Sequence, residues 1–123
     1  METVNVVLLQ NDPGTSQTLT ACLSRSFRSV RAASTLEELR NTLAKHRAQV
    51  IVVDLEKTPL DVVAQLAREF PGVCIVCTHR LADEKMWTAA LNAGAVDICP
   101  SNDTSAVLTA ALRNLKTPPR IAA

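Results

Sequence analysis

The polar residues best suited to chemistry in this chain stand directly after short apolar runs. Asp54 and Thr78 each end such a run, and further polar residues follow two others, at 10–13 and 100–103. A carboxylate can act as a nucleophile, and a hydroxyl can donate a hydrogen bond. An aspartate at the end of a strand also commonly caps the loop that follows it. Both interpretations of Asp54 depend on which elements position it.

Cys74 and Cys77 form the other spacing with known chemistry, because C-x-x-C occurs in redox and zinc sites. The run around them, VCIVCT, is typical of a strand, in which a spacing of three places two side chains on opposite faces. A redox pair also uses a helix N-terminus to lower the pKa of its thiol. We therefore expect these cysteines, like Cys22 and Cys99, to be small hydrophobic residues of the interior.

Composition limits the class of protein. The chain has 123 residues, enough for one domain, and its hydrophobic fraction of 47% excludes a disordered chain. Its 13 basic and 12 acidic residues form no basic block, which disfavours direct binding to nucleic acid. No apolar run approaches the roughly 20 residues that cross a bilayer, and the start has no basic segment ahead of an apolar stretch. These features predict a cytoplasmic protein without membrane contact.

Strand-like and helix-like segments alternate along the chain. Short apolar runs predict five strands, at 4–9, 30–33, 50–53, 73–77 and 96–99. Helical spacing of apolar residues predicts five helices, at 15–27, 36–43, 60–70, 82–93 and 104–115. This alternation predicts an α/β fold, a doubly wound (βα)5 domain with a five-stranded parallel sheet covered on both faces. In such sheets function gathers at the carboxyl ends of the strands.

One domain is expected over residues 1–116. Residues 117–123 are expected to form a tail or linker, because the Pro118-Pro119 pair within them cannot continue a helix.

The layout resembles the receiver domain of bacterial two-component response regulators, over residues 4 to about 115. The residues that carry the resemblance are Asp54, Thr78, Pro13 after the first strand, Pro59 after Asp54, and the Ala93-Gly94-Ala95-x-Asp97 stretch. The resemblance implies a flavodoxin-like receiver fold and a signalling domain rather than an enzyme. It also implies transfer of a phosphoryl group from a histidine kinase to Asp54, with Thr78 as the hydroxyl that follows the phosphate.

Such a transfer needs Mg²⁺, which prefers six oxygen ligands including carboxylates. In the family, the ligands are an acidic pair after the first strand, the nucleophile, and a main-chain carbonyl two residues beyond it, here Glu56. Anchored on Pro13, the acidic pair falls on Gln10 and Asn11, neither of which is charged. A register shifted by one residue would bring in Asp12, although alternation along the strand aims that side chain elsewhere.

The fifth strand departs from the family as well. Ser101 stands at the position of the family's lysine, and Ile98 stands where a switch aromatic is common. A serine can donate one hydrogen bond but cannot offset the charge of a phosphate. Lys57, Arg80 and Arg113 are other possible sources of a cation, and Arg80 is expected in a solvated loop. The resemblance therefore implies a site that holds Mg²⁺ and phosphate weakly.

Two functions stay open. The first is an atypical receiver that acts by regulated protein–protein interaction with phosphorylation impaired. The second is a working phosphoacceptor that uses Asp54 with a non-standard pocket. A third, a flavin- or nucleotide-binding protein, is disfavoured because Asp12-Pro13-Gly14-Thr15-Ser16 does not form a convincing phosphate loop.

Either receiver function implies protein partners: a histidine kinase, an effector domain or a second copy. The face expected to contact them is formed by the helices at 82–93 and 104–115 with the strand at 96–99. Trp87, the only tryptophan, lies on the first of these helices. Packing is the favoured role for Trp87, and contact with a partner is the alternative.

Overall fold

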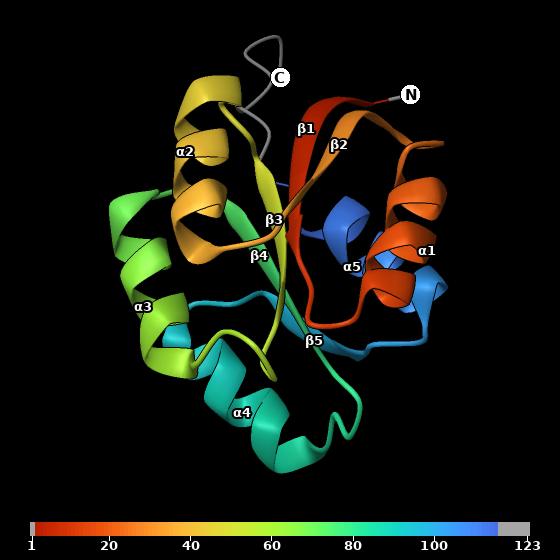
Figure 1. The fold of residues 1–123 in the computed structure, drawn as a ribbon. Helices are drawn as coiled ribbons and strands as arrows, with labels where there is room; N and C mark the ends of the chain where they lie inside the picture. Colours follow the sequence, from red (N-terminus) through yellow and green to blue (C-terminus); the bar gives the residue numbers. More distant parts are fainter. Residues whose placement is uncertain (1, 116–123) are drawn as a thin grey trace, which may run out of the picture.

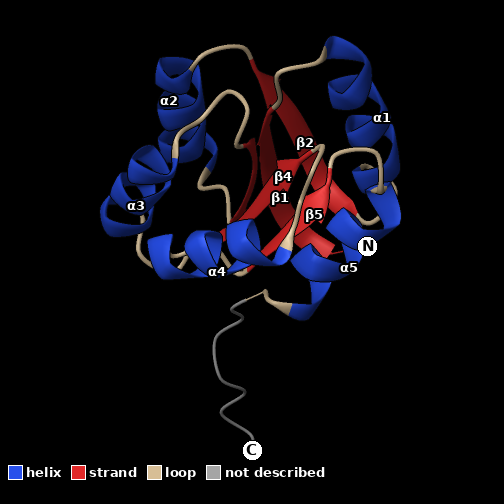
Figure 2. Ribbon diagram, turned by 90° about the horizontal axis from the view of Figure 1, so that it is seen from below, coloured by secondary structure: helices blue, strands red, loops and turns tan. Residues whose placement is uncertain are grey.

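The expected alternation of strands and helices is present in the computed structural model, which describes residues 2–115. In chain order the elements are β1 (Glu2–Leu9), α1 (Pro13–Leu23), β2 (Phe27–Ala33), α2 (Leu36–His46), β3 (Val50–Asp54), α3 (Leu60–Glu69), β4 (Cys74–His79), α4 (Glu84–Ala93), β5 (Asp97–Pro100) and α5 (Thr104–Arg113) (Figure 1). The strands are parallel, in the order β2-β1-β3-β4-β5. Helices α1 and α5 cover one face of the sheet, and α2, α3 and α4 cover the other (Figure 2). The predicted doubly wound fold is confirmed.

The boundary between α1 and β2 differs from the expected one. Phe27, which helical spacing placed at the end of the first helix, begins β2 and is buried. Helix α1 starts at Pro13 and ends at Leu23. The Asp12 carboxylate sets its start by accepting a hydrogen bond from the backbone N–H of Thr15 at 2.8 Å. Strand β2 therefore has 7 residues and begins well before the predicted position 30.

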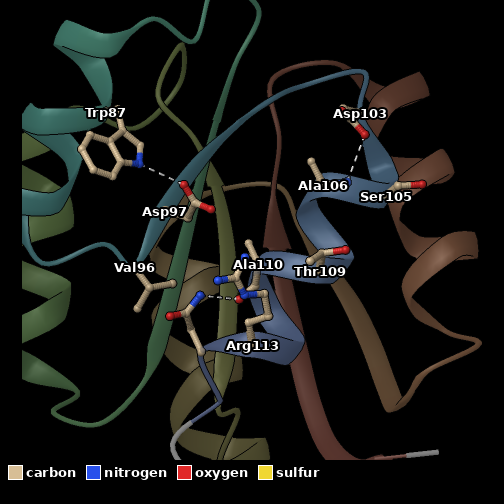
Figure 3. Close-up of a pocket in the computed structure, with 10 residues that line it drawn as sticks. Trp87, Val96, Asp97, Asp103, Ser105, Ala106, Thr109, Ala110 and Arg113 are labelled. Carbon is tan, nitrogen blue, oxygen red and sulfur yellow. Dashed lines mark hydrogen bonds between the residues drawn. The ribbon is translucent and has the colours of Figure 1, made fainter.

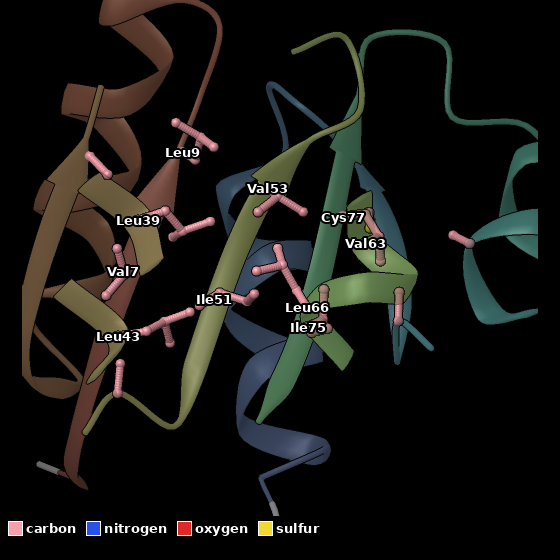
Figure 4. Close-up of a cluster of buried hydrophobic side chains, with 14 of the residues drawn as sticks. Val7, Leu9, Leu39, Leu43, Ile51, Val53, Val63, Leu66, Ile75 and Cys77 are labelled. Carbon is pink, nitrogen blue, oxygen red and sulfur yellow. The ribbon is translucent and has the colours of Figure 1, made fainter. Parts of the chain in front are cut away.

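Two layers of apolar side chains fill the space between the sheet and the helices. Strand β3 is buried along its whole length, as expected for a central strand covered on both faces. On the face covered by α2, α3 and α4, Ile51 and Val53 pack with Leu66 and its neighbours (Figure 4). This packing positions the carboxyl end of β3 rigidly.

The C-x-x-C cysteines lie on opposite faces of the sheet, as predicted. Cys77 belongs to the core beneath α2, α3 and α4, and Cys74 belongs to the core beneath α1 and α5. Burial raises the pKa of the Cys77 thiol to about 12, so the thiolate needed for redox or metal chemistry is strongly disfavoured. Burial, together with nearby negative charge, also raises the pKa of Cys99 to about 12.

None of the helices within residues 2–115 is long and apolar enough to span a membrane. The longest, α1 and α2, have 11 residues each. Residue 116 and the tail expected at 117–123 lie outside the described residues.

Candidate functional site

A polar pocket of about 560 Å³ lies at the carboxyl edge of the sheet. It is lined from the loops after β1, β3, β4 and β5 and from the start of α1, by Asn11, Asp12, Thr15, Asp54, Glu56, Arg80, Ser101 and Asn102. Six of the residues singled out from the sequence, Arg80 among them, are thus brought together, and Gln10 and Thr78 are buried near them at the ends of β1 and β4.

Asp54 is the last residue of β3 and is only 4% exposed. Its Oδ2 accepts a hydrogen bond from the backbone N–H of Asn11 at 3.2 Å, and its Oδ1 accepts one from the N–H of Glu56 at 2.9 Å. Within residues 2–115 no cationic side chain forms an ion pair with it. The carboxylate therefore has the capping role common for aspartate at a strand end, and these two bonds fix its orientation at the pocket.

The side chains of Gln10 and Thr78 bind each other. The Thr78 hydroxyl donates to Oε1 of Gln10 at 3.1 Å, and Nε2 of Gln10 donates to the carbonyl of Val52 at 3.4 Å. Thr78 has no exposed surface and Gln10 is 8% exposed. Breaking a buried bond of this kind and leaving its groups unpaired costs about 1–3 kcal/mol. This hydrogen bond therefore keeps the Thr78 hydroxyl directed at the side-chain amide of Gln10.

Ser101 directly follows β5 and lines the pocket, as its place in the sequence predicted. Its backbone N–H donates to the carbonyl of His79 at 3.2 Å. Its side-chain Oγ is buried and has no hydrogen-bond partner among residues 2–115. The position offers a small hydroxyl and no positive charge.

Arg80 supplies a cation at the rim of the pocket, where it is paired with Glu56. Its Nε donates to both carboxylate oxygens of Glu56 at 3.0 Å, and its backbone N–H donates to Oε1 at 3.2 Å. Although burial raises the pKa of the Glu56 carboxyl, the hydrogen bonds and charge of Arg80 outweigh it, and the pKa lies below its usual value. The Arg80 side chain is 77% exposed, which confirms its expected solvated position. Lys57 and Arg113 do not line this pocket.

The donors at this edge fit Mg²⁺ poorly. Asp12 accepts the N–H and the hydroxyl of Thr15 as a helix cap, and Glu56 pairs with Arg80. No three His, Cys, Asp or Glu side chains in the described part of the chain lie close enough to share a metal ion. Mg²⁺ is usually held by one or two carboxylates together with waters, and the carboxylates that line this pocket already accept hydrogen bonds from the chain.

A second depression, of about 590 Å³, lies between α4 and α5 beside β5 (Figure 3). Trp87 lines it with 46% of its surface exposed, and its Nε1 donates to Oδ1 of Asp97 at 3.2 Å. The packing role favoured for Trp87 is therefore wrong. Ala90 is the buried residue of α4, and Trp87, one turn earlier, lies at the border of the buried face. Val96 and Ala106 add apolar lining, and Arg113 adds a positive charge.

No family model and no curated protein matches the sequence. Among solved structures, a response regulator from Thermotoga maritima aligns with a TM-score of 0.83 at 18% identity, covering 94% of this chain and 99% of that one. A CheY-like protein, TadZ, from Pseudomonas aeruginosa aligns with a TM-score of 0.74 at 28% identity, covering 96% and 98%. The receiver domain of RcsB from Salmonella enterica, solved with the phosphomimetic BeF3-, aligns with a TM-score of 0.77 at 19% identity, covering 97% and 95%. The chain therefore has the fold of response regulator receiver domains, as the resemblance implied.

Proposed function

We propose that this chain is an atypical receiver domain of two-component signalling, which acts by regulated binding to a protein partner while phosphorylation of Asp54 is impaired. The observation that carries the proposal is the buried bond between Gln10 and Thr78. It places a neutral amide where the receiver pattern has an acid. It also engages the hydroxyl that would otherwise follow a phosphoryl group.

The charges around Asp54 support the same conclusion. Phosphoryl transfer needs positive charge to offset the charge that the transferring group carries. Ser101 supplies none, and Arg80 is already paired with Glu56. Asp12, which also lines the pocket, is engaged as the cap of α1. An approaching phosphoryl donor therefore meets no unpaired cation among the residues that line the pocket, and Mg²⁺ meets carboxylates already bonded to Thr15 and Arg80, so we expect both to bind weakly.

The partner surface in this proposal is the α4–β5–α5 face. Trp87 is half exposed there, and its bond to Asp97 fixes the orientation of the indole ring. Tryptophan is enriched among the residues that dominate binding energy, and a side chain ordered before binding loses less entropy when a partner arrives. A histidine kinase, an effector domain and a second copy are the candidate occupants. The proposed mode of action is binding, without an enzymatic step, and without direct contact with nucleic acid or membrane.

The alternative function is a phosphoacceptor with an unusual cation. Arg80 is favoured for that role because it bonds Glu56 through Nε, and its Nη atoms make no hydrogen bond within residues 2–115 to hold them. In this alternative the guanidinium turns from Glu56 toward a phosphoryl group on Asp54. Ser101 would then donate its unpartnered hydroxyl to a phosphoryl oxygen.

Titration with BeF3- and Mg²⁺ separates the two functions. We expect no saturable change in the backbone ¹H–¹⁵N resonances of Thr78, Ser101 or helix α4, because the pocket lacks the charges that hold a phosphoryl-like anion. The RcsB receiver, treated in parallel, shows that the reagent is active. Saturable shifts that vanish in Asp54→Ala and weaken in Arg80→Ala would favour the phosphoacceptor instead.

A further inference from the structure

The charges of this chain are sorted in space, although the net charge is only +1. Each helix follows a parallel strand, so all five helices begin at the carboxyl edge of the sheet and end at the amino edge. Acidic residues cap the helices or stand in their first turns, at Asp12, Glu37, Glu38, Asp61, Asp83, Glu84 and Asp103. This arrangement complements the helix dipoles. At the amino edge, where the helices end, α2, α3 and α5 carry basic residues in their last turns, at Lys45, His46, Arg68 and Arg113.

Five exposed cations stand in the two segments at that edge, the one that begins β2 and the one that ends α2. We call them the basic edge: Arg25, Arg28, Arg31, Lys45 and Arg47. The two segments that carry them, 25–33 and 45–49, contain no acidic residue. Among residues 4–115, whose side chains the structure describes, none of the five has an ion-pair partner, since the ion pairs there join Arg40 to Glu69 and Arg80 to Glu56. The end of α2 and the start of β2 lie at the same end of the molecule (Figure 1).

A chain of hydrogen bonds fixes this corner. The Ser29 hydroxyl donates to Oδ1 of Asn5 at 2.8 Å, and Nδ2 of Asn5 donates to the carbonyl of His46 at 2.8 Å. Strand β2 is thereby tied through β1 to the last residue of α2. Burial, with the charges of Arg31 and Lys45, lowers the pKa of His46, as expected where cations from both elements are close. These bonds fix the backbone segments that carry Arg28, Arg31, Lys45 and Arg47 relative to one another.

The outer side of β2 carries no strand. β2 pairs only with β1, so along its other side the backbone N–H and C=O groups have no ladder partner within the described residues. The opposite edge of the sheet is protected, because β5 has only 4 residues and ends in Pro100. β2 has 7 residues and contains neither proline nor glycine. An edge of this length is able to accept another strand.

We propose that the outer edge of β2 binds an extended acidic segment of another protein, which adds to the sheet as a strand beside the basic edge. Backbone hydrogen bonds along β2 would supply affinity, and Arg28 and Arg31, which point to opposite faces of the strand, would each select for an acidic side chain on its own face. This surface is separate from the Asp54 pocket and from the α4–β5–α5 face.

Other binding partners match this surface less well, because each fits only the cations or only the open strand edge. Two copies paired through β2 would bring like charges together, which is destabilising across paired strands. The acidic residues described above stand in helix caps and first turns, so a second copy does not offer them on an extended strand. A nucleic acid would use the cations but has no backbone that can continue a β-ladder. A polypeptide strand uses both.

The test uses fluorescently labelled peptides and the full chain. The first peptide is a valine-rich strand with two glutamates three positions apart, one on each face to match Arg28 and Arg31, and the second carries the same charges with proline in place of valine. We expect the first peptide to bind, the second not to bind, and amide hydrogen exchange of residues 28–32 to slow in the complex. Duplex DNA and phosphatidylserine vesicles serve as competing polyanions, and we expect both to bind more weakly than the first peptide.

Two variants with equal change in net charge locate the site. Arg28→Ser combined with Arg31→Ser is expected to lower the affinity for the first peptide by about tenfold, because two charges complementary to the peptide are lost. Arg68→Ser combined with Lys85→Ser, at exposed positions on α3 and α4, should leave its affinity unchanged. The proposal is overturned if the first peptide does not bind, if the proline peptide, DNA or vesicles bind as tightly, or if both double variants weaken binding equally.

Discussion

The triple variant Gln10→Asp, Asn11→Asp and Ser101→Lys is expected to accept a phosphoryl group on Asp54 far faster than the natural chain. The two acids would give Mg²⁺ its carboxylate ligands, and the lysine would place a cation where Ser101 now has an unpartnered hydroxyl. Removing one such stabilising group from an active site typically costs 10²–10³ in rate, so restoring three should raise the rate of acetyl phosphate labelling by at least roughly 100-fold.

Two further measurements control this prediction. Adding Asp54→Ala to the triple variant should abolish the labelling, which identifies the acceptor. Mg²⁺ should raise the free energy of unfolding of the triple variant, by about 3 kcal/mol at a concentration near 100 times its Kd, and should leave that of the natural chain almost unchanged. If the triple variant and the natural chain label at the same rate, the missing charges are not what limits phosphorylation.

Gly94→Ala is expected to lower the free energy of unfolding by about 3 kcal/mol, through backbone strain and overpacking together. Gly94 ends α4 in the left-handed region, with φ of 112°, and an added Cβ would lie 2.8 Å from the Cβ of Ala67. Real Cβ atoms do not approach that closely, so α3 and α4 would have to move apart. Urea denaturation followed by circular dichroism measures the loss.

Gly72→Ala is the matched control for this substitution. Gly72 also has a positive φ, of 92°, but nothing lies within 4 Å of the Cβ that alanine would add. It should therefore show the strain alone, about 1 kcal/mol. Adding Ala67→Gly to Gly94→Ala removes the clash, although it also removes a partly buried methyl group from the α3–α4 contact. If Gly72→Ala and Gly94→Ala lose equal stability, crowding against Ala67 contributes nothing.

Central strands were the most predictable part of the fold. β3 and β4 are buried on both faces, so they appear in the sequence as continuous apolar runs, and the polar residues after them mark the carboxyl edge. β2 was predicted too short because an edge strand is half exposed and its pattern is weak. Phe27 fitted a helical spacing by position, and pairing with β1 overrides that local pattern.

The contacts within the candidate site were the least predictable. Gln10 and Thr78 were both identified, yet their hydrogen bond joins residues 68 positions apart and has no local signal. The pairing of Glu56 with Arg80 similarly depends on two loops that meet only in the folded sheet. Trp87 was misjudged because helical spacing places a residue on a stripe but does not show where the stripe leaves the core.

Intact-mass analysis of the natural chain after incubation with acetyl phosphate and Mg²⁺ tests the proposed function most directly. The RcsB receiver is the positive control, and circular dichroism verifies that the sample is folded. We predict no phosphoryl adduct on the natural chain, because the Gln10–Thr78 bond and the Arg80–Glu56 pair leave Asp54 without the charges that the transfer needs. A single adduct that is absent from Asp54→Ala would contradict this prediction and establish a working phosphoacceptor.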